Sequence, residues 1–144
     1  MHSNWRDCQA WRDEKLPMNT TSNEAAKLFD ISLSQIVGFY EEKQHGGIFP
    51  SLTKMIEADH RFVLGHCLKI GVESFGNNAI FGSQLDKTKE KVKSLIDLKE
   101  KELPNLTKRE VFHVNAIENL TRGDLVEATN IWERILFDGL TFSF

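Results

Sequence analysis

Several features are scarce or missing in this sequence, and each absence narrows the class of protein. The 144 residues include only two cysteines and three prolines. The cysteines form neither a CxxC pair nor a dense framework, which argues against a disulfide-stapled scaffold or a zinc ribbon. The N-terminal segment lacks a signal-peptide core, and no apolar run approaches the roughly 18 residues of a membrane span. We therefore expect a cytoplasmic protein in which Cys8 and Cys67 are reduced thiols.

An excess of basic charge is also missing. The chain has 18 Lys and Arg residues against 21 Asp and Glu residues, for a formal net charge of −3. Nucleic acid and anionic membranes are therefore poor candidate partners. The sequence contains no P-loop, GxSxG, HExxH or GxGxxG motif, which removes the commonest sequence signals for nucleotide, hydrolase and dinucleotide chemistry.

What the sequence does contain is a series of helix start and stop signals. Thr21 and Glu24 have capping-box spacing and predict a helix over about 22–43, ended by Gly46 and Gly47. A second helix is expected over about 49–58 and a fourth over about 84–103. Between them, Asp59 is expected to cap a third helix. No segment alternates with period two for long enough to predict a strand, so the predicted fold class is all-α.

Two more helices are expected in the last third of the chain. Thr107 and Glu110 repeat the capping-box spacing, and Asp124 opens a final helix that ends near residue 137. At helical spacing, the apolar residues of these helices should face the protein core. They include Ala25, Leu28, Phe29, Leu33, Ile36, Val37, Phe62, Val63, Cys67, Ile70, Phe75, Leu85, Val92, Ile96 and Leu103. The three N-x-T triplets, at Asn19, Asn105 and Asn119, are interpreted as helix-cap chemistry because no secretory signal accompanies them.

The last two predicted helices match the pattern of a tetratricopeptide-like hairpin, in which small residues allow two helices to approach closely. Gly123 fits the turn, and large aromatic residues fill the wedge beside the small ones. The predicted repeat positions are Phe112, Ala116, Gly123, Ala128, Trp132 and Ile135. A poorer copy lies upstream, around Gly46 and Gly47. We therefore predict antiparallel helical hairpins stacked as a short α-solenoid of about six helices.

Five motifs together resemble the N-terminal portion of the tetratricopeptide repeat protein 38 family. They are RDCQAW (6–11), TTSNEAAKLFD (20–30), GGI (46–48), FVLGH (62–66) and LTKREVFHVNAIE (106–118). The resemblance covers about residues 6–138 and implies an α-solenoid longer than this chain, without an established catalytic activity. It divides the chain into an N-terminal arm (1–19), a truncated repeat domain (20–138) and a C-terminal tail outside the family pattern (139–144).

Two histidines are weak candidates for chemistry. His66 and His113 match histidines that recur in the resembled family, and they could form a metal pair or transfer a proton. Alternatively, each ring fills a contact between helices, because a single histidine per helix lacks metal-ligand spacing. We do not expect Cys67 to form a dyad with His66, since adjacent residues on a helix point about 100° apart. We expect no catalytic, cofactor-binding or metal site, and no cofactor.

The leading hypothesis for function is a non-catalytic protein–protein interaction scaffold with a protein or peptide partner. One alternative is a hydrolase or metal-dependent enzyme that uses His66, His113 and a carboxylate such as Glu73 or Glu118. Another is a truncated product without independent activity.

Two further expectations concern the ends of the chain. Trp11 should pack on the first hairpin, whereas Trp5 should lie in a loose end. The last helix has a broad apolar face, so Leu140, Phe142 and Phe144 should either fold over it or leave it to self-associate.

Overall fold

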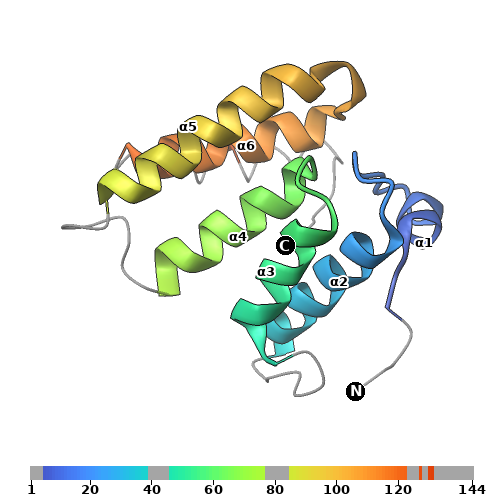
Figure 1. The fold of residues 1–144 in the computed structure, drawn as a ribbon. Helices are drawn as coiled ribbons and strands as arrows, with labels where there is room; N and C mark the ends of the chain where they lie inside the picture. The colour runs from blue at the N-terminus through green and yellow to red at the C-terminus, as the bar shows by residue number, and fades with distance from the viewer. Residues whose placement is uncertain (1–4, 39–45, 77–84, 123–126, 128–129, 132–144) are drawn as a thin grey trace.

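The computed structural model describes residues 5–38, 46–76, 85–122, 127, 130 and 131. Its regular structure within these ranges is entirely helical, which confirms the all-α prediction (Figure 1). The elements are α1 (Cys8–Asp13), α2 (Asn23–Gly38), α3 (Ile48–Ala58), α4 (Val63–Gly76), α5 (Leu85–Glu102), a 3-10 turn η3 (Leu103–Asn105) and α6 (Lys108–Thr121). The predicted helix over 124–137 lies almost entirely outside the described residues, and the tail over 139–144 lies wholly outside them.

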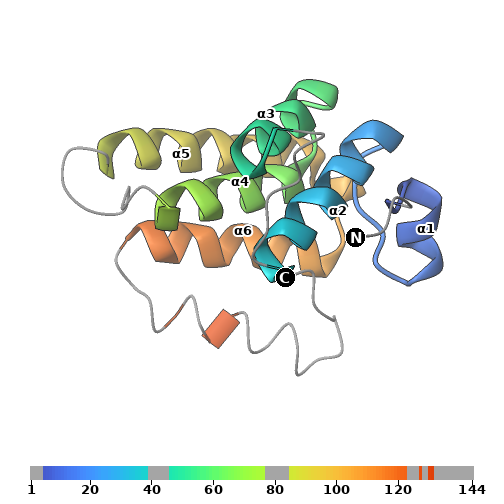
Figure 2. The same cartoon turned by 90° about the horizontal axis from the view of Figure 1, so that it is seen from below.

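The helices pack as a hairpin joined to a group of three (Figures 1 and 2). α2 and α3 lie side by side, and α4, α5 and α6 all contact one another. α4 also contacts α3, so it connects the two parts, while α1 packs beside α2 at the edge of the molecule. This arrangement is consistent with a helical repeat-like fold.

α4 contributes to two separate hydrophobic cores because its apolar residues occupy two faces. Leu64 and Leu68 are four residues apart, so they share the face that packs into the core with α2 and α3. Val63, Cys67 and Ile70 follow the same helical spacing on another face. That second face meets Val92 and Leu95 of α5 and Val114 and Ile117 of α6.

Of the predicted capping boxes at α2 and α6, one is confirmed and one is wrong, while the same spacing at Asp124 and Glu127 involves a residue outside the described ranges. The Thr107 hydroxyl accepts a hydrogen bond from the Glu110 amide, and the Glu110 carboxylate accepts one from the Thr107 amide. At α2, however, Ser22 rather than Thr21 supplies the cap, since Ser22 Oγ accepts from Ala25 N at 3.1 Å. The Thr20 hydroxyl in turn accepts from Ser22 N. With Ser22 as its cap, α2 starts at Asn23, one residue later than the sequence spacing predicted.

The turn before α3 follows the sequence prediction closely. Gly46 and Gly47 have φ values of +82° and +92°, which glycine adopts without the steric cost that a Cβ would bring. Pro50 lies in the first turn of α3, where its missing N–H costs little. The Ser51 hydroxyl donates to the Gly47 carbonyl oxygen at 2.6 Å, which stabilises the helix start.

Most predicted core positions in the described residues are buried, but Ile96 is only partly buried and two others are exposed. Ile36 is 37% exposed in the last turn of α2, and Leu103 is 46% exposed in η3. Leu95, which was not predicted, is 2% exposed. Helical periodicity gives the direction of a side chain but not whether a neighbouring helix reaches it, and Leu103 lies beyond the end of α5. The side chains of Val37, Phe75 and Leu85 lie outside the described residues.

Candidate functional site

Only two of the six predicted repeat positions lie in the described part of the chain. Ala116 is fully buried on α6, which suits a position where helices approach closely. Phe112 is half-buried, and Lys108 Nζ lies 5.4 Å from its ring centroid. Gly123, Ala128, Trp132 and Ile135 lie outside the described residues, so the hairpin alignment stays a prediction.

His66 and Cys67 are neighbours on α4 with different environments. His66 is half-buried, and its Nε2 lies 2.8 Å from the carbonyl oxygen of His60. Burial lowers the pKa of His66, although the contact with His60 acts in the opposite direction. Cys67 is buried in the second core, and this burial raises the pKa of its thiol far above the usual range. A buried neutral thiol is a poor nucleophile.

His113 is buried on α6, one helical turn after Arg109. Only 2% of His113 is exposed. Burial, followed by the positive charge of Arg109, lowers the pKa of His113 to about 3. Both effects penalise the imidazolium, so the ring is neutral at pH 7.

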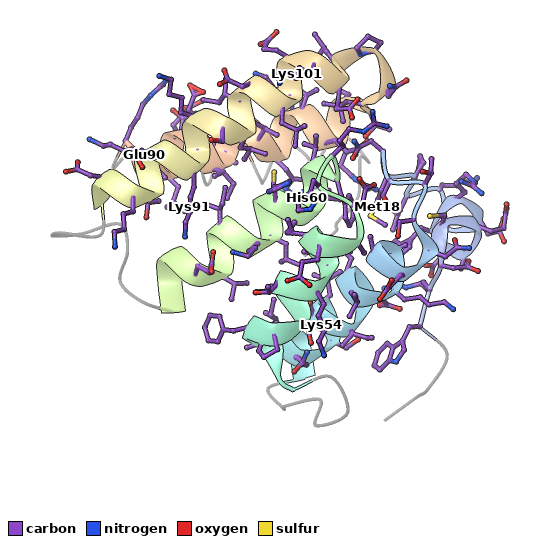
Figure 3. The ribbon with its side chains drawn as sticks, viewed as in Figure 1. Met18, Lys54, His60, Glu90, Lys91 and Lys101 are labelled. Atoms are coloured by element: carbon purple, nitrogen blue, oxygen red, sulfur yellow. The ribbon has the colours of Figure 1, made fainter. Side chains whose placement is uncertain are left out.

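The two carboxylates considered for an enzyme are both engaged in ion pairs. Glu73 accepts from Lys69 Nζ at 2.9 and 3.0 Å. Lys91, which is labelled on α5 in Figure 3, has its Nζ 3.5 Å from the same carboxylate. Glu118 is paired with Arg122, one turn further along the chain. Glu73 therefore helps to join α4 to α5, and Glu118 stabilises the end of α6.

A cluster of polar contacts lies where residues 16–20, called the strap, meet the N-terminal ends of α4 and α6. Asn19 Oδ1 accepts from Val63 N at 3.0 Å, and Asn19 Nδ2 donates to the Arg61 carbonyl oxygen at 2.6 Å. The backbone N–H of Asn19 donates to Glu110 Oε2 at 3.0 Å. Asn19 thus connects the starts of two helices that are distant in sequence.

Residues of α6 hold the strap from the other side. Arg109 Nη2 donates to the carbonyl oxygens of Leu16 and Pro17, at 3.5 and 3.2 Å. Glu110 is fully buried, and burial raises the pKa of its carboxyl although its hydrogen bonds and Arg109 oppose this rise. A buried carboxylate is tolerated where it is hydrogen-bonded, and Glu110 accepts from both Thr107 and Asn19.

Asp59 does not cap α4, contrary to the sequence prediction. Its carboxylate accepts from Arg61 N at 3.0 Å and from the Thr20 hydroxyl at 2.5 Å. α4 begins only at Val63, whose amide is bound by Asn19. A cap supplied from a distant segment leaves no local spacing signal, so sequence reasoning missed it.

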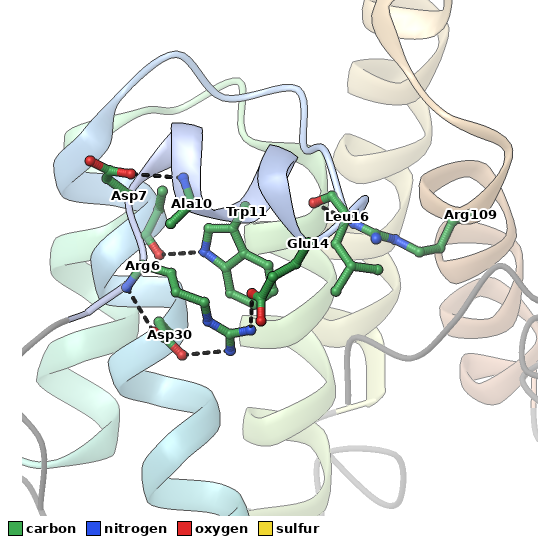
Figure 4. Close-up of polar contacts among 9 residues, drawn as sticks. Arg6, Asp7, Ala10, Trp11, Glu14, Leu16, Asp30 and Arg109 are labelled. Carbon is green, nitrogen blue, oxygen red and sulfur yellow. Dashed lines mark hydrogen bonds and ion pairs between the residues drawn. The ribbon is translucent and has the colours of Figure 1, made fainter.

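The N-terminal arm also contains a short helix that the sequence analysis did not predict. Residues 5–13 are called the clip, and Figure 4 shows how they dock on α2. Arg6 N and Arg6 Nη2 donate to the Asp30 carboxylate, each at 2.8 Å. The Arg6 guanidinium lies 3.7 Å from the centroid of a Trp11 ring, and Trp11 Nε1 donates to the Ala26 carbonyl oxygen.

Of the predictions made for the two tryptophans of the arm, one is confirmed and one is wrong. Trp11 is 2% exposed and contacts Phe29 edge-to-face with centroids 5.6 Å apart, which confirms that it packs on the first hairpin. Trp5 is half-buried against the first core, so the expectation of a loose end is wrong. The signal for the clip was the pairing of apolar Cys8 and Trp11 three residues apart.

The polar groups described above join segments of the chain to one another. In the described residues, no three His, Cys, Asp or Glu side chains are grouped so that they could hold a metal ion. None of the helices in this same part of the chain is both long enough and apolar enough to cross a membrane. No protein-family model matches the sequence, and no solved structure matches the fold.

Proposed function

We propose that this chain is a non-catalytic protein–protein interaction scaffold of the tetratricopeptide repeat protein 38 type, acting in the cytoplasm on a protein or peptide partner. The observation that supports the proposal is that the candidate polar side chains are engaged in ion pairs or in hydrogen bonds at helix ends. Glu73 and Glu118 are neutralised by lysine and arginine, and Asn19 and Glu110 hold helix ends. Side chains committed in this way serve the architecture rather than a reaction.

A second observation supports a binding role for the α2–α3 hairpin. Phe49 is 44% exposed in the first turn of α3, and Ile36 is exposed in the last turn of α2. Because the two helices form a hairpin, both side chains lie at the end where the helices are connected. Exposed aromatic and aliphatic side chains at one end of a hairpin are suited to anchor a partner.

The test is a quantitative pull-down with three forms of the chain. Wild type is compared with the Ile36→Ser/Phe49→Ser double variant and with Leu103→Ser, a matched control in which an exposed leucine is replaced elsewhere. Each captured protein is then purified, and its binding to the chain is measured directly. We expect a partner that binds wild type and the control equally and binds the double variant at least about tenfold more weakly.

Two results would contradict the proposal. One is that every captured protein binds the double variant as tightly as it binds wild type. The other is turnover of a hydrolase substrate that is lost in a His66→Ala/His113→Ala variant, because that result would assign catalysis to the two histidines. Circular dichroism confirms in each case that the variant is folded.

A further inference from the structure

The clip docks on one stripe of α2. Asn23, Ala26 and Asp30 are spaced three and four residues apart, so they lie on the same face of that helix. Cys8 N donates to Asn23 Oδ1 at 3.2 Å, and Trp11 Nε1 donates to the Ala26 carbonyl oxygen at 3.3 Å. Arg6 completes the docking with its two bonds to Asp30. The main helix contact of α1 is accordingly with α2.

The strap has anchors of its own besides one contact with the clip, in which Cys8 Sγ donates to the Thr20 carbonyl oxygen at 3.5 Å. Its carbonyl oxygens at Leu16 and Pro17 accept from Arg109, and Asn19 is bound to Val63, Arg61 and Glu110. These contacts are with α6 and the start of α4, not with α2. The contacts with α6 and α4 can therefore hold the strap in place when the clip leaves α2 and its contact with Thr20 is broken.

The connection between clip and strap is a strained turn. α1 ends in a Schellman motif, in which Lys15 N donates to Arg12 O at 2.9 Å and Leu16 N donates to Trp11 O at 3.0 Å. This motif needs a left-handed residue, and Lys15 has a φ of +62°. A residue with a Cβ is disfavoured there. Residues 12–15 are exposed, so the turn itself belongs to no core, and the core contacts of Cys8 and Trp11 are the ones that exchange must restore.

We propose that the clip exchanges between two copies of this chain, so that each clip docks on α2 of the other copy. A second copy carries the same clip and the same stripe of Asn23, Ala26 and Asp30, so it can form every clip–α2 contact seen within one chain. Opening the turn also releases Lys15 from its left-handed conformation. Exchange of identical elements across a short strained hinge is a known low-cost route to dimers. This interface is separate from the exposed end of the α2–α3 hairpin.

Charge reversal of the Arg6–Asp30 pair tests the exchange. An Arg6→Glu chain and an Asp30→Arg chain each place like charges together within one molecule. When the two chains are mixed, a swapped heterodimer restores opposite charges at both docking sites. We expect native mass spectrometry to show the heterodimer at least about tenfold above either homodimer. The Arg6→Glu/Asp30→Arg double variant, which restores the pair within one chain, is the control and should not show this preference.

Two variants of the hinge test the exchange independently of charge reversal, which could prevent folding. Lys15→Gly removes the strain and should weaken the wild-type dimer by about fivefold or more. Deleting Lys15 shortens the hinge, so the clip should reach only the other copy and the chain should become dimeric by light scattering. A Lys15-deleted chain that stays monomeric, folded or unfolded, overturns the proposal. So does a mixture of charge-reversed chains without heterodimer when the double variant folds normally.

Discussion

The side-chain oxygen of Asn19 lies 3.0 Å from the backbone nitrogen of Val63, which is 44 residues further along the chain. The first amides of a helix have no partner within the helix, and a cap usually comes from the residue just before it. In α4 the cap comes from the strap instead. Since the Asn19 amide also donates to Glu110, one residue holds the starts of both α4 and α6.

Replacing Asn19 with alanine should destabilise the whole fold. The substitution removes the cap on Val63 and leaves the Arg61 carbonyl oxygen without its donor. Loss of a cap costs about 0.5–2 kcal/mol, and we expect a value near about 2 kcal/mol because two bonds are lost. Urea unfolding measures the change. Asn105→Ala, in the exposed η3 turn, is the matched control, and an equal effect of both substitutions would contradict this role.

Stability should fall as the pH is lowered, because of His113. Its folded pKa of about 3 lies below its ordinary value of 6.5, so the folded state favours the neutral ring. The resulting stability is fully present above about pH 6.5 and is lost as the pH falls toward about 3. Between pH 7 and pH 5 the loss should be about 2 kcal/mol.

A His113→Gln variant isolates this contribution. The raised pKa of Glu110 has the opposite sign, because protonation of its buried carboxyl favours the folded state as the pH falls. Comparing wild type with His113→Gln at each pH cancels the effect of Glu110. The variant should lose less stability than wild type on acidification, and parallel curves for the two proteins would rule out His113 as the cause.

Lys15→Gly should stabilise the protein. Lys15 has a φ of +62°, and glycine adopts this conformation without steric cost, although it adds entropy to the unfolded chain. We expect a net gain of about 0.5–1 kcal/mol in the free energy of unfolding. Lys27→Gly, at an exposed position inside α2, provides the contrast. It should cost about 1 kcal/mol, and a loss of stability in both variants would exclude strain at Lys15.

Two glycines of α4 should respond in opposite ways to alanine. A Cβ on Gly65 would lie 2.6 Å from Cδ2 of the buried Phe62 ring, so Gly65→Ala should cost about 1–3 kcal/mol. A Cβ on Gly71 would lie 3.6 Å from Cδ1 of Ile117, which is ordinary contact. Gly71→Ala should therefore gain about 0.5–1 kcal/mol. Thermal unfolding measures both, and equal effects would contradict the close packing of Phe62.

The sequence predicted those helices whose signals are local. Thr107 and Glu110 form their capping box because both partners lie within one turn, and the glycine pair before α3 marks its start unambiguously. Thr21 was wrong by one residue because Ser22 is an equally good cap. Neighbouring cap-forming residues can be separated only by the wider context, which here includes the Thr20 hydroxyl.

The strap and the clip could not be predicted in the same way. Asn19 acts on Val63 and Glu110, and Arg6 acts on Asp30, through contacts that depend on the packing of distant helices. No spacing rule links such pairs. The protonation state of His113 was similarly open, because burial, which depends on helix packing, is the main cause of its lowered pKa, ahead of the charge of Arg109.

The two faces of α4 have a consequence for how the protein opens. Leu64 and Leu68 belong to one core, while Val63, Cys67 and Ile70 belong to the other. We therefore expect an amide in the middle of α4 to reach solvent only when both cores have separated, whereas α1 contributes Cys8 and Trp11 to the first core alone. Hydrogen exchange should therefore be slowest in the centre of α4 and should report the global unfolding free energy there, while the amides of α1 exchange through a cheaper local opening.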